Sequence, residues 1–400
     1  MKILFEDTIP LGHEYFSGLG DVSRYAWQTL TPEDIKNVDI LAVRSTTKVN
    51  ETLLSQASQL QFVTTATSGT NHMDKIWLDS QGISWNSAGG CNAVAVAEYV
   101  LSALFLADRA GKIDINAITV GIVGAGHVGT ALAKRLAALN IDYKLCDPPL
   151  SAADDPRTFV DFQDIINCDV ITLHVPYVKT GSHTTGKLIN ADVLEQLGSN
   201  QLLINACRGE VIDEQALLNR LKQPNAPTVV LDVFENEPAI NPELVQYCWL
   251  MTPHIAGHSV EGKVRGTQYV YEQICNLLEE PCTKTLGEYL SAVDPIKVEL
   301  ASASASTLSK QDLIGLMLQV YNLLDDDTAF RERLGEALER QQNESADSEE
   351  ITASISHTFA TMRKSYRVRR ECSAYTLILP SNTSDEIKQQ LKGLGFLVQA

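Results

Sequence analysis

The feature that most constrains the fold is a regular alternation of short apolar segments with connections long enough to form a helix. Six segments have the composition of buried strands, and they span 119–124, 143–147, 169–174, 201–207, 227–234 and 249–254. Strands separated by helical connections pair in parallel, with helices on the faces of the sheet. This part of the chain is therefore predicted to form a doubly wound α/β domain of the nucleotide-binding type.

The first 90 residues repeat this pattern. Their apolar segments span 2–6, 39–44, 61–66 and 83–87. They predict a second parallel sheet in a lobe of its own. The run 92–111, rich in Ala, Leu and Val, predicts a long and mostly buried helix. Helical spacing at 260–280, ended by Pro281, predicts a helix that could return the chain to the first lobe.

The character of the chain changes after residue 290. An amphipathic helix is expected at 311–324, a helical segment at 355–364, a strand at 374–380, and a helix–strand pair after it. Residues 291–400 are interpreted as an α+β appendage without internal repeats.

The charge balance restricts the partners. The chain has 32 Lys and Arg against 50 Asp and Glu residues, a formal net charge of −18, so neither nucleic acid nor a membrane is an expected partner. Part of the excess lies in the acidic stretch 325–350, interpreted as a solvated helix face and loop. The basic cluster 363–370 is expected to pair with that stretch; the alternative is that it reaches the site of a partner subunit.

The cysteines favour a reducing compartment. None of the eight belongs to a C-x-x-C pair, and no His-rich neighbourhood has metal-ligand spacing, so no metal is expected. The N-terminus has no signal-peptide pattern, and no apolar run approaches about 18 residues. A cytoplasmic protein with reduced, mostly buried thiols is expected.

The string GAGHVG places Gly124, Gly126 and Gly129 in the pattern G-x-G-x-x-G. It follows a predicted strand and opens a predicted helix, so main-chain N–H groups at the helix N-terminus would face a pyrophosphate. Asp147 lies 18 residues beyond Gly129, at the end of the next strand. A carboxylate there accepts hydrogen bonds from both ribose hydroxyls and repels a 2′-phosphate, which predicts NAD rather than NADP as the cofactor.

Arg208, Glu237 and His254 follow later strands of the same predicted domain, where an open parallel sheet binds its ligands. Hydride transfer from a carbon that bears a hydroxyl needs a base for the hydroxyl proton, and imidazole suits this role. A neighbouring carboxylate favours the imidazolium, and a guanidinium holds a substrate carboxylate through two parallel hydrogen bonds. The three residue types together predict a dehydrogenase site.

A family resemblance rests on motifs that occur in a fixed order. They are GAGHVG, HVP at 174–176, NACRGEVIDEQAL at 205–217, LDVFENEP at 231–238 and TPHIAG at 252–257. With them, residues 1 to about 290 resemble the D-isomer-specific 2-hydroxyacid dehydrogenases. The resemblance implies that Arg208 binds the substrate carboxylate, that Glu237 orients and charges His254, and that His254 is the catalytic acid and base.

The resemblance also implies an architecture and binding residues. It implies a flavodoxin-like substrate lobe (1–92 and 265–290), a Rossmann NAD domain (93–264) and a C-terminal α+β dimerisation domain (291–400) that forms a homodimer. The implied cofactor contacts are Gly124, Gly126, His127, Val128, Gly129, Asp147, Val175, Cys207, Arg208, Asp232 and Gly257. The implied substrate contacts are Ser45, Thr67, Arg208 and His258.

Within the family, the strings at 43–50, 65–74, 89–100 and 204–213 and the tail at 359–371 resemble a branch that oxidises a phosphorylated 2-hydroxy acid. The tail resembles the dimerisation domain of that branch rather than a small regulatory ACT domain. Such a substrate needs cationic groups, and the candidates are Arg208, Arg44, Lys48 and His258.

Several alternatives stay open at this point. His258 stands where the family is expected to have a tyrosine, which puts its substrate contact in doubt. The Ser45 hydroxyl could instead cap a helix or close a turn. The rival functions are oxidation of 3-phosphoglycerate or another D-2-hydroxy acid, and a non-catalytic protein that senses NAD.

Overall fold

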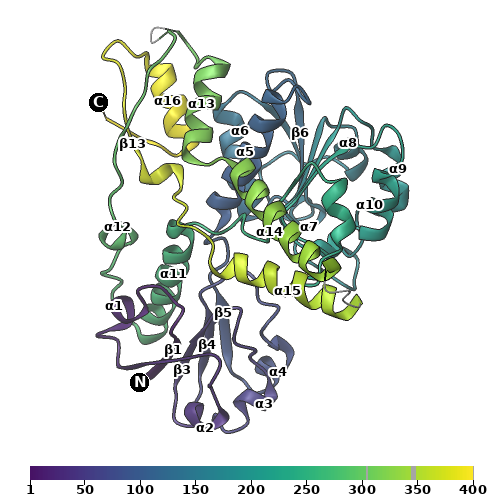
Figure 1. Cartoon of the computed structure of the whole chain (residues 1–400). Helices are drawn as coiled ribbons and strands as arrows, with labels where there is room; N and C mark the ends of the chain where they lie inside the picture. The colour runs from purple at the N-terminus through teal and green to yellow at the C-terminus, as the bar shows by residue number, and fades with distance from the viewer. Residues whose placement is uncertain (303–304, 344–347, 400) are drawn as a thin grey trace. The chain divides into compact units, whose positions relative to one another are not determined.

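In a computed structural model, which describes residues 1–302, 305–343 and 348–399, the chain divides into two compact units (Figure 1). The first unit comprises Met1–Ala93 and His258–Val293, and the second comprises Val94–Gly257 and Asp294–Ala400. The second unit thus contains both the six-stranded sheet and the C-terminal region.

The first unit is built on a five-stranded parallel sheet in the order β2-β1-β3-β4-β5, the flavodoxin-like order. The strands are β1 (Lys2–Glu6), β2 (Asp21–Tyr25), β3 (Ile40–Val43), β4 (Phe62–Thr65) and β5 (Ser84–Ser87). Four of them were expected from the sequence, which confirms the second parallel sheet. The edge strand β2 was missed because most of its side chains are exposed and lack an apolar pattern.

Short helices connect these strands, and one long helix packs on them. The helices are α1 (Gly12–Phe16), α2 (Pro32–Ile35), α3 (Glu51–Leu54), α4 (Lys75–Ser80), α11 (Val260–Leu278) and α12 (Leu286–Tyr289). Ser259 caps the start of α11 by accepting the Gly262 N–H. On α11, Gln273 accepts the Thr64 hydroxyl hydrogen bond at 2.6 Å. α11 therefore packs on the sheet of the first unit.

The second unit contains a six-stranded parallel sheet in the order β11-β10-β9-β8-β6-β7. Its strands are β6 (Thr119–Val123), β7 (Asp142–Cys146), β8 (Val170–Leu173), β9 (Leu202–Asn205), β10 (Thr228–Leu231) and β11 (Leu250–Met251). All six expected strands are confirmed. The Val160 N–H donates to Leu145 O on the outer side of β7, where the Rossmann order has a further strand.

Helices cover this sheet. They are α5 (Ala93–Arg109), α6 (His127–Ala138), α7 (Pro148–Ser151), α8 (Phe162–Ile166), α9 (Ala191–Gln196) and α10 (Glu214–Leu221), with the 3-10 helices η1 (Gly209–Val211) and η2 (Pro242–Gln246). The expected long helix is α5, and its Tyr99 and Phe105 are fully buried in the core.

The C-terminal region forms helices and a three-stranded parallel sheet in the order β12-β13-β14. Its elements are β12 (Ile296–Lys297), α13 (Lys310–Val320), α14 (Leu323–Asn343), α15 (Ser348–Lys364), η3 (Cys372–Ala374), β13 (Thr376–Ile378), α16 (Asp385–Leu394) and β14 (Leu397–Val398). In Figure 1, α14 and α15 run from green to yellow beside the six-stranded sheet of the same unit.

Two expectations for this region are wrong. The single helix expected at 311–324 is interrupted because Tyr321 is extended and the Asn322 side chain accepts the Leu324 N–H, which starts α14. The acidic stretch is not solvated throughout, since Asp326 and Asp327 are 7% and 5% exposed. Arg367 forms an ion pair with Asp326 at 3.0 Å, which confirms for these two residues the expected pairing of the basic cluster with the acidic stretch. Residues 344–347 of the stretch lie outside the described residues.

Among the helices that the structure describes, none is both long and apolar enough to cross a membrane.

A buried carboxylate organises the first unit. Glu6, at the end of β1, is fully buried and accepts hydrogen bonds from the hydroxyls of Thr8, Thr46 and Thr47 and from the Arg44 N–H at 2.9 Å. Burial alone would raise the pKa of Glu6, but these hydrogen bonds outweigh it and lower the pKa below the ordinary value. The ionised carboxylate therefore holds the loop after β3, which carries Ser45.

We expect Glu6→Gln to lower the free energy of unfolding by roughly 2 kcal/mol at neutral pH, because charged acceptors make the stronger hydrogen bonds. Because the pKa of Glu6 is lower in the folded protein than in the unfolded chain, where it is about 4.3, its ionisation stabilises the folded state above that pH. This stabilisation is lost as the pH falls through the pKa of the folded protein. Urea unfolding at several pH values measures the free energy of unfolding, and the difference between wild type and Glu6→Gln should narrow below about pH 4.

The matched control is Glu33→Gln. Glu33 is an exposed carboxylate of α2 whose partner is Lys36 at the surface, so a change within about 0.5 kcal/mol is expected at every pH. A gap between Glu6→Gln and wild type that stays constant with pH would show that ionisation of Glu6 does not contribute.

Candidate active site

The glycine-rich turn of the second unit has the geometry that a pyrophosphate requires. Gly124 follows β6 with φ +94°, and a Cβ there would lie 2.5 Å from His174 O. A Cβ on Gly129 would collide with Gly124 O, whereas the space above Gly126 is open. Gly126 is the N-cap of α6, so the first turn with His127 and Val128 presents its N–H groups at this opening. The turn therefore fits the phosphates of a dinucleotide.

Asp147 follows β7 and lies beside this turn. Its Oδ2 accepts the Ala125 N–H at 2.9 Å, and its Oδ1 accepts the Leu150 N–H at 3.1 Å. Each carboxylate oxygen can accept a further hydrogen bond, so both remain able to bind a ribose hydroxyl. The geometry is that expected of an adenosine ribose ligand.

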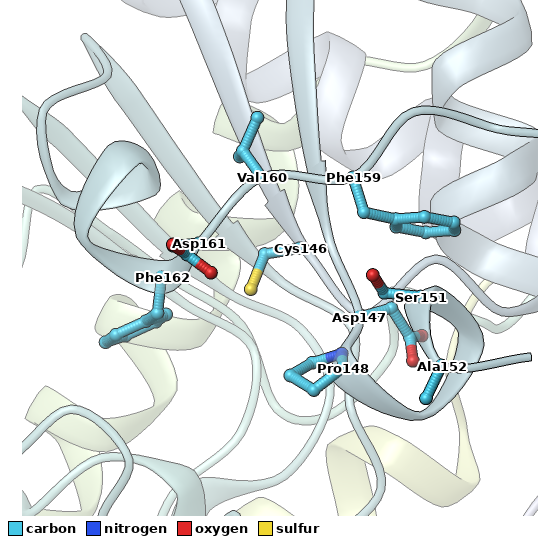
Figure 2. A pocket seen from close by; sticks show the side chains of 9 residues that line it. All are labelled: Cys146, Asp147, Pro148, Ser151, Ala152, Phe159, Val160, Asp161 and Phe162. Atoms are coloured by element: carbon cyan, nitrogen blue, oxygen red, sulfur yellow. The ribbon is translucent and has the colours of Figure 1, made fainter.

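A pocket of about 260 Å³ adjoins Asp147. It is lined by Cys146, Asp147, Pro148, Ser151, Ala152, Phe159, Val160, Asp161 and Phe162. Figure 2 shows Asp147 and Ser151 on one side of the hollow, Asp161 and Phe162 on the other, and Cys146 between them. The mixed apolar and polar lining suits an adenine ring and its ribose.

Val175, Cys207 and Arg208 also lie at the carboxyl ends of strands in this sheet. Val175 borders the glycine turn, since a Cβ on Gly124 would lie 3.0 Å from its Cγ1. Cys207 donates its N–H to the Asn205 side chain, and burial raises the pKa of its thiol to about 11. One Arg208 N–H donates to Cys207 O at 2.6 Å, and the guanidinium has five N–H groups in all.

His254 and Glu237 form a direct pair in the second unit. His254 Nδ1 lies 2.6 Å from Glu237 Oε2, and the other carboxylate oxygen accepts the Phe234 N–H at 3.0 Å. Burial would raise the pKa of Glu237, but the hydrogen bond and charge of His254 and the Phe234 N–H together lower it. The ionised Glu237 therefore receives the Nδ1–H and orients Nε2 away from itself.

Asp232 holds the main chain around His254. Its Oδ1 accepts the Thr252 hydroxyl and the Ile255 N–H, both at 2.7 Å, and its Oδ2 accepts the Ala256 N–H at 3.0 Å. Its own carbonyl accepts the His254 N–H at 2.7 Å. Burial raises the pKa of Asp232. Its role as a cofactor contact stays a prediction, and so does that of Gly257, which ends this segment.

Close packing joins the loops of Arg208 and Glu237. A Cβ on Gly209 would collide with the main chain of Phe234, so only glycine permits the two loops to approach this closely. The strands β9, β10 and β11 are neighbours in the sheet, and their carboxyl ends carry Arg208, Glu237 and His254. The structure therefore brings the three predicted catalytic residues to one edge of the second unit.

The predicted substrate contacts Ser45, Thr67 and His258 lie in the first unit. Ser45 is exposed in the loop after β3, and Thr67 follows the neighbouring strand β4, where its hydroxyl donates to Gly69 O at 3.2 Å. His258 directly precedes the cap of α11. Two of the three contacts thus come from the carboxyl ends of adjacent strands.

Two residues that support the site lie outside the sequence motifs and were not predicted. Arg157 pairs with Asp155 and donates to Ala125 O at 2.8 Å, inside the glycine turn. Glu6 accepts the Arg44 N–H at 2.9 Å and so holds the loop of Ser45. An acidic residue that ends an apolar strand was a visible signal for Glu6, whereas Arg157 stands in a segment without any pattern. Within the described residues, no group of three or more His, Cys, Asp or Glu is arranged to hold a metal.

Comparison with known proteins agrees with the fold. The family of the D-isomer specific 2-hydroxyacid dehydrogenase, NAD binding domain, matches residues 102–256, and a domain of unknown function (DUF3410) matches residues 294–395. Solved structures of the same fold include an NAD+-bound 3-phosphoglycerate dehydrogenase from Entamoeba histolytica, 22% identical with a TM-score of 0.59. It covers 70% of this chain and 95% of its own length.

A D-lactate dehydrogenase from Aquifex aeolicus, complexed with NAD and lactic acid, covers 69% of this chain and 95% of its own length, with 21% identity and a TM-score of 0.56. Residues 102–256 of the second unit are therefore an NAD-binding domain, and the class is that of the NAD-dependent 2-hydroxyacid dehydrogenases.

Relatives that span the whole chain are more specific. The erythronate-4-phosphate dehydrogenase of Pseudoalteromonas atlantica is 47% identical over 94% of this chain and 95% of its own length. That of Marinobacter nauticus is 43% identical over 99% of both chains. The chain belongs to the family of the erythronate-4-phosphate dehydrogenases. This is the branch to which the sequence resemblance pointed, and the predictions of fold class, enzyme class and NAD as cofactor are confirmed.

Proposed function

We propose that this chain oxidises 4-phospho-D-erythronate at C2 to 2-oxo-3-hydroxy-4-phosphobutanoate with NAD+, a step of pyridoxal phosphate biosynthesis. The observation that carries the proposal is the His254–Glu237 pair at 2.6 Å on an NAD-binding sheet. Relatives named for this substrate match the chain from end to end. The alternative substrate 3-phosphoglycerate rests on fold likeness alone.

The residues of the second unit divide the chemistry between them. Bound NAD+ would be held by the glycine turn and Asp147, and it supplies the acceptor for the hydride that leaves C2. His254 Nε2 takes the proton of the C2 hydroxyl, so loss of a proton and a hydride converts the alcohol to a ketone. Glu237 stabilises the resulting imidazolium, and Arg208 binds the C1 carboxylate through its guanidinium.

The first unit offers the cations that a phosphorylated substrate needs. Arg44 and Lys48 share the loop with Ser45, and the Arg44 guanidinium is directed by donating to Thr8 O at 3.0 Å. Burial lowers the pKa of Lys263 on α11, and the positive charge of Arg44 lowers it further. An anion between them would relieve their repulsion. We assign the substrate phosphate to this cationic side of the first unit.

Substrate profiling tests the proposed reaction. We expect NADH formation with 4-phospho-D-erythronate at a kcat/KM at least about a hundredfold above that with 3-phosphoglycerate or D-lactate, because buried groups that recognise a missing substituent are left unpaired. Steady-state absorbance at fixed NAD+ measures these rates. A preference for another 2-hydroxy acid would contradict the proposed substrate.

His254→Gln is the control for the chemistry. The amide keeps a polar side chain of similar size but does not accept the proton, so kcat should fall by about 10²-fold or more while NADH still binds. Binding of NADH without turnover of any 2-hydroxy or 2-oxo acid by the wild type would favour the non-catalytic NAD sensor. Turnover that survives in His254→Gln would remove His254 from its proposed role.

We expect Asp147→Ala to relax the choice of cofactor. Loss of the ribose hydrogen bonds and of the repulsion toward a 2′-phosphate should lower the ratio of kcat/KM for NAD+ to that for NADP+ by about tenfold or more. Asp155→Ala is the matched control, because Asp155 steadies the same turn through Arg157 without facing a ribose. It should weaken both cofactors equally. An unchanged ratio in Asp147→Ala would exclude Asp147 as the ribose ligand.

We further propose that the chain forms a homodimer through the C-terminal region. Val368, Ile378 and Leu397 are large apolar residues of this region that are 78%, 41% and 54% exposed, and Ile378 and Leu397 lie on neighbouring strands. Exposed apolar groups on a small sheet suit burial against a second copy. Sedimentation equilibrium should give twice the chain mass, and a monomer mass at micromolar concentration would contradict this.

The thiols suit the cytoplasm, where we place the protein. Burial raises the pKa of Cys146 to about 11 and that of Cys248 to about 12, so both remain as unreactive thiols. Cell fractionation would test this placement.

A further inference from the structure

The segment that carries His254 is held from outside its own sheet. β11 pairs with β10 along one edge, and at its other edge the Met251 N–H donates to Asp327 Oδ1 of α14 at 2.7 Å. Arg331, one turn along α14, donates to both Asp327 oxygens and to Trp249 O at 3.2 Å. Side chains of α14 thus take the place of a further strand beside β11.

Arg369 holds the other end of the same segment. Its side chain is buried, 2% exposed, and its two terminal nitrogens donate to Ala256 O at 3.0 Å and to Ala95 O at 2.7 Å. The guanidinium lies 3.5 Å above the ring of Tyr321, which supports its plane. One planar group therefore ties the segment after His254 to the start of α5.

The hydrogen bond from Arg369 to Ala256 O matters because the nearby His254 main chain is in the left-handed region, with φ +56°. A residue with a Cβ adopts this conformation only where its surroundings determine it. Asp232 accepts the Ala256 N–H, and Arg369 donates to the carbonyl of the same residue. The peptide groups on both sides of Ala256, two residues beyond His254, are thereby fixed.

The C-terminal region also supports Glu237. The ring of Phe234, whose N–H donates to Glu237, packs against Phe359 of α15 at 6.0 Å and against Phe330 of α14 at 6.5 Å. Both members of the His254–Glu237 pair thus depend on residues beyond 294. The solved dehydrogenases of the same fold cover about 70% of this chain with 95% of their own length, so they have no counterpart for the remainder.

We propose that Arg369 is a positioning residue for the dehydrogenase reaction: it locks the segment 254–256 so that His254 Nδ1 stays on Glu237, and it makes the C-terminal region part of the catalytic unit. The proposal rests on the proposed acid–base role of His254. The lock uses the forked geometry of a guanidinium, because two different terminal nitrogens each donate to a carbonyl on a separate segment, whereas an ammonium presents all its donors from one nitrogen.

Arg369→Lys tests the lock in the full-length protein, since it retains the charge and loses the fork. We expect kcat to fall by about tenfold to a hundredfold, as for a small misplacement of a catalytic group, with the Kd for NADH within about threefold of wild type. The acidic limb of the kcat pH profile should move, because the variant loosens the contact with His254 that helps to lower the pKa of Glu237. Stopped assays with 4-phospho-D-erythronate and NADH fluorescence measure these quantities.

Arg220→Lys is the matched control. Arg220 is also buried, 7% exposed, and lies on α10. It donates to the main-chain carbonyls of Leu194, Leu197, Pro224 and Asn225, none of which belongs to the His254 segment. It should lower Tm while kcat stays within about twofold of wild type and the pH profile is unchanged. An equal loss of kcat and an equal shift of the limb in both variants would reduce Arg369 to a general stabiliser.

Two further results would overturn the proposal. A folded Arg369→Lys with wild-type kcat and an unmoved pH profile would overturn the proposal. If Arg369→Lys does not fold, Tyr321→Leu removes the ring beneath the guanidinium together with the hydroxyl that donates to Asp326. It should give a smaller loss of kcat with the same shift of the limb, and an unmoved limb there would overturn the proposal equally. Wild-type and His254→Gln rates, measured in parallel, separate a failure of this proposal from a failure of the proposed function.

Discussion

The buried carboxylate of Asp232 is the interaction on which the active edge of the second unit depends. A buried carboxylate is tolerable only when its oxygens are filled with hydrogen bonds, and Asp232 obtains them from the loop that follows the neighbouring strand. The loop must therefore bend back over the end of β10. That bend places His254 in the left-handed region and directs its imidazole at Glu237.

The same device recurs at two other strand ends. Asp147 at the end of β7 accepts the Ala125 N–H of the glycine turn after β6, and Glu6 at the end of β1 accepts the Arg44 N–H of the loop after β3. In a parallel sheet the carboxyl ends of adjacent strands lie side by side, so an acid on one strand reaches the loop of the next. Three carboxylates thus hold the glycine turn, the loop of Ser45 and the His254 segment in shape.

The C-terminal region departs from the role of a separate appendage. Asp327 binds the outer edge of β11, Arg331 binds the carbonyls of Cys248 and Trp249 just before this strand, and Arg369 binds Ala256 O. An edge strand with unsatisfied main-chain groups is a weak place in a sheet. Covering it with charged side chains lets one region serve as both a candidate dimer surface and a support for the chemistry.

Local patterns in the sequence determined a large part of this protein. Strand-forming runs, the spacing of GAGHVG and Asp147, and the residues Arg208 and His254 at strand ends were readable because each depends on neighbours in the chain or on the rule that parallel strands align their ends. Only the tertiary structure decided the edge strand β2, the break at Tyr321, the burial of Asp326, and the contacts of Arg157 and Arg369. These depend on partners distant in the sequence, and a buried arginine and a solvated one look alike until the fold brings its carbonyl acceptors within reach.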